Sequence, residues 1–167
     1  MTTINARLKL RRDTDANIQA ATIDAYEPLY ATDTHKLYIS DGATKTEIPL
    51  LQHVNYTATG DIDISDCNGS ILNNWGQEAE ATLTLPVAAS GLHFKVIISE
   101  STYALHIKAN TDDKIILDGT ALDNADKVSL ASPAVADSAF FFTFQTGASK
   151  WNWACQTITG TWTDGGA

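Results

Sequence analysis

The chain has 167 residues, a length that fits one ordinary domain or a small module joined to a domain. It is 44% hydrophobic and 19% charged, as in a globular protein, and no apolar run approaches the roughly 20 residues of a membrane span. Its net charge of −9 argues against nucleic-acid binding over the body of the protein, because neutralising phosphates requires a basic surface.

The N-terminal segment is basic and alternates in character. Residues 4–11 place apolar and basic side chains on opposite sides, which predicts a strand with one buried face. The first twelve residues have a charge of +4 and no acid, leaving −13 for the rest. Two interpretations stay open for this segment: a surface that docks an acidic partner, or a solvated strand face. Its basic residues are Arg7, Lys9, Arg11 and Arg12.

The next part of the chain predicts a small β module. Residues 13–25 form a loop or one or two turns of helix, with Asp13 or Asp15 as the cap. From Pro28 a β-meander follows, with reversals at 33–35 and at 41–42. We therefore divide the chain into an N-terminal module (1–50), a joint (51–60), a second module (61–158) and a mobile tail (159–167).

The second module is predicted to consist of successive short strands. Turns recur about every 8–12 residues and no segment keeps a 3.6-residue period. This pattern predicts an all-β protein whose second module is an antiparallel, jelly-roll-like β-sandwich. The strands are expected at 61–64, 81–85, 92–99, 103–107, 114–117, 127–130, 139–145 and 150–156.

An aromatic run occupies residues 140–144. Phe140, Phe142 and Phe144 share one face of the expected strand, and Phe141 lies on the other. An aromatic stripe at strand spacing usually belongs to a core. Phe141 then faces outward, so we expect a second subunit to cover it.

The sequence shows no catalytic or metal-binding pattern. Cys67 and Cys155 form no CxxC pair; a buried free thiol is expected at Cys155, and a disulfide between the two is left open. No histidine has a second ligand at zinc spacing, although His93 and His106 are expected on adjacent strands. GxSxG and P-loop motifs are absent. We expect no enzyme, no metal and no cofactor.

Two segments near the N-terminus resemble a recurring module of phage tail-fibre and receptor-binding proteins, the family of the major tropism determinant. They run from Ala6 to Arg12 and from Tyr26 to Gly42. The matching positions are Glu27, Pro28, Tyr30, Thr32, Asp33, Thr34, Leu37, Asp41, Gly42 and Pro49. Tyr26 and Ser40 stand where the family pattern has glycine. The resemblance implies a homotrimer whose N-terminus lies at or near the virion.

The second module is similar to β modules of phage capsid decoration and head-fibre proteins. The similarity rests on Ala81 to Phe94 and on Asp118 to Val128. Together the two resemblances imply a structural protein of the phage virion that is made in the host cytoplasm. The short chain and the missing repetitive shaft favour a capsid decoration (cement or head-fibre) protein at the capsid surface.

Two other functions remain as alternatives. The alternative is a short tail-fibre or receptor-binding subunit that binds host cell-surface glycans through tryptophan; the candidates are Trp75, Trp151, Trp153 and Trp162. A hydrolase of surface glycans is the third. We expect self-association and docking to the major capsid protein or another virion protein, with neither nucleic acid nor membrane as partner. The expected docking residues are Arg7, Lys9, Arg11 and Arg12. The expected subunit-packing residues are Leu8, Leu10, Tyr30, Leu37 and Phe141.

Overall fold

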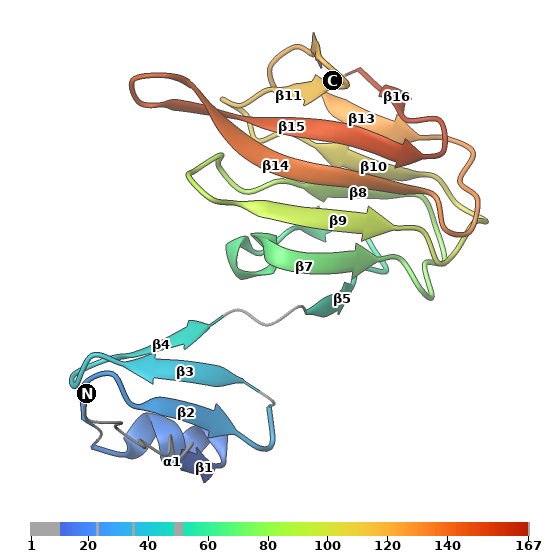
Figure 1. Ribbon diagram of the computed structural model, residues 1–167. Helices are drawn as coiled ribbons and strands as arrows, with labels where there is room; N and C mark the ends of the chain where they lie inside the picture. The colour runs from blue at the N-terminus through green and yellow to red at the C-terminus, as the bar shows by residue number, and fades with distance from the viewer. Residues whose placement is uncertain (1–10, 23, 35, 49–51, 167) are drawn as a thin grey trace, which may run out of the picture. The chain divides into compact units, whose positions relative to one another are not determined.

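The computed structural model describes residues 11–22, 24–34, 36–48 and 52–166. The chain divides into two compact units, residues 1–50 and 51–167, and each is described by itself (Figure 1). Strands are the main secondary structure of both units, so the predicted all-β class is confirmed.

The N-terminal unit is a four-stranded sheet with one short helix. The sheet order is β1-β2-β3-β4; β1 runs parallel to β2, and the other two pairs are antiparallel. The predicted meander therefore forms β2 to β4, and the end of the basic segment adds a parallel edge strand. The elements are β1 (Arg11–Asp13), α1 (Asp15–Ala20), β2 (Pro28–Ala31), β3 (Leu37–Ser40) and β4 (Lys45–Ile48).

The helix α1 covers one face of this sheet. Thr14, in extended conformation, accepts a hydrogen bond from the backbone N–H of Asn17 and is the cap, in place of the predicted Asp13 or Asp15. Asp15 instead occupies the first turn, where its charge favours the helix dipole. The helix buries Ile18 in a small core, whose other buried members are Leu29, Ala31 and Tyr38.

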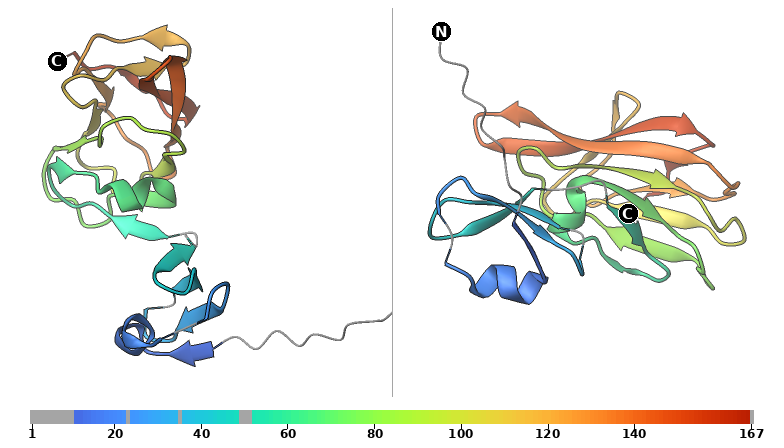
Figure 2. Two further views of the ribbon diagram at one scale, coloured as in Figure 1. Left: turned by 90° about the vertical axis from the view of Figure 1, so that its left-hand side faces the viewer. Right: turned by 60° about the horizontal axis from the view of Figure 1, so that its bottom comes forward.

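The second unit is a sandwich of two sheets (Figures 1 and 2). The seven-stranded sheet has the order β12-β11-β15-β14-β9-β7-β5, and the five-stranded sheet β16-β13-β10-β8-β6. One continuous hydrophobic core contains buried residues from both sheets. The elements are β5 (His53–Asn55), β6 (Gly60–Asp61), η1 (Ile64–Cys67), β7 (Asn68–Asn73), β8 (Ala81–Thr84), β9 (His93–Ile97), β10 (Leu105–Lys108), β11 (Ile115–Leu117), β12 (Thr120–Ala121), β13 (Lys127–Leu130), β14 (Ser138–Gly147), β15 (Lys150–Thr159) and β16 (Thr163–Asp164).

The pairing corrects the prediction of an antiparallel, jelly-roll-like arrangement. From β5 to β10 the chain crosses from one sheet to the other at every strand. The chain direction reverses at each crossing, so after two crossings the chain returns to the same sheet in its original direction. The strands β5, β7 and β9 are therefore parallel to one another, as are β6, β8 and β10. Antiparallel pairs join β9, β14 and β15, and also β10, β13 and β16. Alternating side chains predict strands but do not specify their partners.

Two predicted segment boundaries are wrong. Residues 53–55, placed in the joint, form β5 and pair with β7. Residues 163–164, placed in the mobile tail, form β16 and pair with β13. The end of the chain packs closely on β13, because a Cβ at Gly165 would collide with the side chain of Ser129. Trp162 is 6% exposed and belongs to the core.

The faces of the aromatic strand are opposite to the prediction. Phe141 is fully buried in the core, so it is not a subunit-packing residue of an outer surface. Phe140, Phe142 and Phe144 lie half-buried on the outer face of the seven-stranded sheet. The two faces of this strand are both aromatic, and strand periodicity alone does not say which face meets the second sheet.

Candidate functional site

The sheet of the N-terminal unit has a second, apolar face. Alternation along β2 and β3 buries Leu29 and Tyr38 against the helix side and leaves Tyr30 and Leu37 half-buried on the other. Tyr30 and Leu37 are directly paired across the two strands, and Leu37 also pairs with Ile48 of β4. The structure thus brings together Tyr30 and Leu37, the two subunit-packing candidates described in this unit. Leu8 and Leu10 lie outside the described residues.

The predicted docking residues are only partly described. Arg11 and Arg12 are exposed in β1, the edge strand of the sheet. Their backbone is held by parallel pairing with Leu29 and Tyr30 of β2. Arg7 and Lys9 lie outside the described residues. The two arginines are thus anchored to the sheet with their side chains in solvent.

The loops of the N-terminal unit are held by local hydrogen bonds. Asp41 accepts from the backbone N–H of Ala43 and from the N–H and hydroxyl of Thr44, and these bonds lower its pKa to about 2. Across the sheet, the Lys36 Nζ lies 2.9 Å from a carboxylate oxygen of Glu47, and this bond raises the pKa of Lys36. The hydrogen bonds of Asp41 in the turn and the Lys36–Glu47 ion pair across the strands therefore both stabilise the β3–β4 hairpin.

Trp75 is the exposed tryptophan of the second unit. Trp153 and Trp162 are buried in the core, and Trp151 packs partly against it. Trp75 is 67% exposed in the turn after β7. It lines a pocket of about 300 Å³, here named the Trp75 pocket. The residues of this pocket are His53, Asn55, Asn73, Trp75 and Ser99.

Amide side chains fix the turn that carries Trp75. The backbone N–H of Trp75 donates to Asn73 Oδ1 at 2.9 Å, and its carbonyl accepts from Asn55 Nδ2 at 2.7 Å. The neighbouring Asn74 is 1% exposed, and its side-chain oxygen accepts hydrogen bonds from the backbone N–H groups of Ser99 and Glu100. Its side-chain nitrogen donates to the Glu100 carbonyl and to Gln77 Oε1. The sequence analysis did not predict this turn. The one sequence feature that indicates it is the run of amide residues around Trp75 and Gly76.

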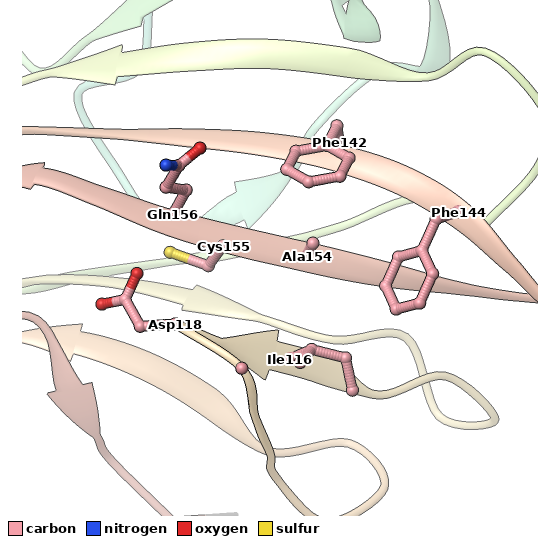
Figure 3. Close-up of a pocket in the computed structure, with 8 residues that line it drawn as sticks. Ile116, Asp118, Phe142, Phe144, Ala154, Cys155 and Gln156 are labelled. Atoms are coloured by element: carbon pink, nitrogen blue, oxygen red, sulfur yellow. The ribbon is translucent and has the colours of Figure 1, made fainter.

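A second pocket lies on the outer face of the seven-stranded sheet (Figure 3). Its volume is about 500 Å³. Ala154 of β15 pairs with Phe142 on one side and with Ile116 on the other, and its small side chain leaves a hollow between the larger ones. Phe144 extends the aromatic wall, with its ring centroid 6.5 Å from that of Phe142. At one end Asp118 accepts bonds from the backbone N–H and hydroxyl of Thr157.

The comparison with protein families concerns the N-terminal unit. Residues 8–44 match the major tropism determinant N-terminal domain. The unit is a phage tail-fibre-like module, which confirms the resemblance seen in the sequence for this part of the chain. The protein is accordingly a tail-fibre-related structural protein and a component of a phage virion. No curated protein matches the chain. The similarity of the second unit to capsid decoration proteins stays a prediction.

The geometry of the tail-fibre-like module explains why the family pattern has glycine at position 26. Tyr26, which replaces an expected glycine, has a φ of 67°. This left-handed conformation suits glycine and strains a residue with a Cβ. Because Tyr26 is 85% exposed, its side chain gains little packing in return.

The other residues considered for chemistry lie apart. His93 is in the seven-stranded sheet and His106 in the five-stranded sheet, so they are not on adjacent strands as predicted. His106 contacts Ser129 and Glu80 through its two ring nitrogens. Within the described ranges, no three His, Cys, Asp or Glu residues are grouped as a metal site would need. No helix in the same ranges is long and apolar enough to cross a membrane.

Both cysteines are free and buried. Burial raises the pKa of the Cys67 thiol to about 12 and raises that of Cys155 as well. The thiolate is the reactive form of cysteine, so neither group is prepared for nucleophilic chemistry.

Proposed function

We propose that the protein is a non-enzymatic attachment and recognition protein of the phage tail. In this proposal the N-terminal unit fastens the chain to the particle, and the sandwich unit is presented to the host surface. The observation that carries the proposal is the family match over residues 8–44, which names a tropism determinant. The Trp75 pocket of the sandwich unit supplies a surface for recognition.

The proposal includes a homotrimer. Its support is the apolar face in each unit: Tyr30 and Leu37 in the N-terminal sheet, and Phe142 and Phe144 in the outer face of the sandwich. Half-buried apolar faces leave water when copies of a chain associate by closed symmetry. Sedimentation equilibrium should give three times the 18.0-kDa chain mass. A monomer at micromolar concentration would contradict this part of the proposal.

A capsid decoration protein is the second candidate. The similarity of Ala81–Phe94 and Asp118–Val128 to decoration and head-fibre modules supports it. In that function the trimer binds the major capsid protein and stabilises only the assembled shell, because binding favours the state that is bound. The first candidate function places the protein on the tail, and the second places it on the surface of the head.

Electron microscopy of virions labelled at the C-terminus of this chain distinguishes the two. Label at the tail supports the tail proposal. Label distributed over heads, together with binding of the purified protein to tail-less heads, would replace it by the decoration function. Purified virions that lack the protein altogether would contradict both.

A further inference from the structure

We propose that the Trp75 pocket binds a neutral saccharide. The inference deepens the proposed recognition function, on which it rests for the source of the ligand, a glycan at the host cell surface. It depends on three properties of the pocket: an exposed indole, a rigid turn beneath it, and a lining without carboxylate, ammonium or guanidinium groups.

The exposed indole is the first property. At 67% exposure, Trp75 leaves most of a large apolar ring in water. The other three tryptophans use their rings to pack in or against the core, whereas Trp75 does not belong to the core cluster. An aromatic ring is a flat surface on which the apolar C–H face of a sugar ring can lie, while the sugar hydroxyls remain at its edges.

The rigid turn is the second property. Hydrogen bonds from Asn55 and to Asn73 hold the backbone of Trp75 on both sides. Asn74 and Gln77, both buried, tie the same turn to the backbone at Glu100 and Ala104. A ligand therefore meets a surface already in place and loses little binding free energy to ordering the turn.

The lining is the third property, and it determines the class of ligand. Among the described residues that line the pocket, none carries a carboxylate, an ammonium or a guanidinium group. Ser99 contributes a hydroxyl and His53 an imidazole ring, while the amides of Asn55 and Asn73 line the pocket and are bonded to the Trp75 backbone. Hydroxyl and imidazole groups donate and accept hydrogen bonds as sugar hydroxyls do. Without a charge partner, the pocket offers nothing to offset the desolvation of an ionic ligand.

The pocket at Phe142 and Phe144 provides a comparison. Its walls are aromatic and aliphatic, and the carboxylate of Asp118 is already bonded to Thr157. Because Phe142 and Phe144 belong to the face assigned to the trimer, a substitution there is no control for glycan binding. The matched control for loss of an exposed aromatic ring is Tyr26, which is 85% exposed in the N-terminal unit.

The test uses the full-length protein on a glycan array. The probes are neutral oligosaccharides of glucose, galactose, mannose and N-acetylglucosamine, together with sialylated and sulfated counterparts. We expect binding to at least one neutral glycan. Trp75→Ala should then weaken the affinity for that glycan at least tenfold, and Tyr26→Ala should change it less than twofold. Binding should shift the tryptophan emission of the wild type to the blue, and the shift should be absent in Trp75→Phe.

Three results would overturn the inference: no binding to any neutral glycan, a preference for the charged counterparts, or wild-type affinity in Trp75→Ala. Circular dichroism of each variant shows whether it is folded, and Ser99→Ala provides a second variant that removes a polar lining group but leaves the indole and the side-chain bonds of its turn in place. Virions carrying Trp75→Ala should contain the protein in normal amount. Absence of the wild-type protein from virions would overturn the proposed function, whereas its presence without glycan binding would overturn the saccharide inference alone.

Discussion

The rings of Phe94 and Phe141 stack in the core of the sandwich unit, with centroids 5.1 Å apart and planes 5° from parallel. The two residues are paired across β9 and β14. Trp153 meets Phe94 edge-on at 5.7 Å, and Trp162 meets Phe141 edge-on at 6.4 Å. This stack decides which face of the aromatic strand is inside the protein.

Phe141→Ala should destabilise the sandwich unit by about 4 kcal/mol, since it removes a fully buried ring and leaves a cavity. Phe142→Ala, one position along the same strand on the outer face, should cost less than half as much. The free energy of unfolding of each variant in urea measures the difference. Equal losses, or a larger loss for Phe142→Ala, would contradict the inward orientation of Phe141.

Asn74→Ala should destabilise the same unit by about 3 kcal/mol, because it leaves buried backbone groups at Ser99 and Glu100 without their partner. The loss also frees the turn that carries Trp75. Hydrogen exchange of residues 73–77 should accelerate relative to the rest of the unit. Exchange unchanged in this segment would show that the amide network does not hold the turn.

Tyr26→Gly should stabilise the N-terminal unit by about 1 kcal/mol, since glycine adopts the left-handed conformation of residue 26 without a Cβ clash. Differential scanning calorimetry measures the gain. Tyr26→Ala is the control: it removes the ring but keeps the Cβ, so it should leave stability nearly unchanged. If both variants are equally stabilising, the strain assigned to this position is wrong.

Asp41 should make the stability of the N-terminal unit depend on acid pH. Its folded pKa of about 2 lies below the ordinary value of 3.8, so its stabilising contribution is complete above pH 4 and is lost as the pH falls toward 2. Asp41→Ala should therefore melt at lower temperature than the wild type at pH 7. The gap should narrow between pH 4 and pH 2, and a gap that is constant over this range would contradict the assignment.

Replacing Arg11 and Arg12 together by Ser should weaken attachment to the particle without unfolding the N-terminal unit, since both side chains are exposed. Charge pairing at an exposed surface is screened by salt, so the loss should be largest at low ionic strength. Occupancy of the variant on purified virions, against Lys45→Ser as a control for loss of a cation, measures the effect. Wild-type occupancy at all salt concentrations would remove the docking role of these residues.

Local patterns in the sequence determined much of the outline of this protein. Alternating residues predicted an all-β chain, and Asp41-Gly42 marked a hairpin turn that the structure contains. The ordered match from Glu27 to Gly42 indicates the tail-fibre-like module. These features depend on neighbours a few residues apart, which the sequence displays directly.

Only the tertiary structure decided the rest, because it depends on contacts between distant residues. The parallel pairing of β5, β7 and β9 follows from crossings between sheets, and the inward orientation of Phe141 follows from its stack on Phe94. The sequence predicts four tryptophans as candidates for glycan binding, but it does not show which of them is exposed. The fold buries two and packs the third against the core, and it holds Trp75 in solvent on a turn tied down from residues as distant as Glu100 and Ala104.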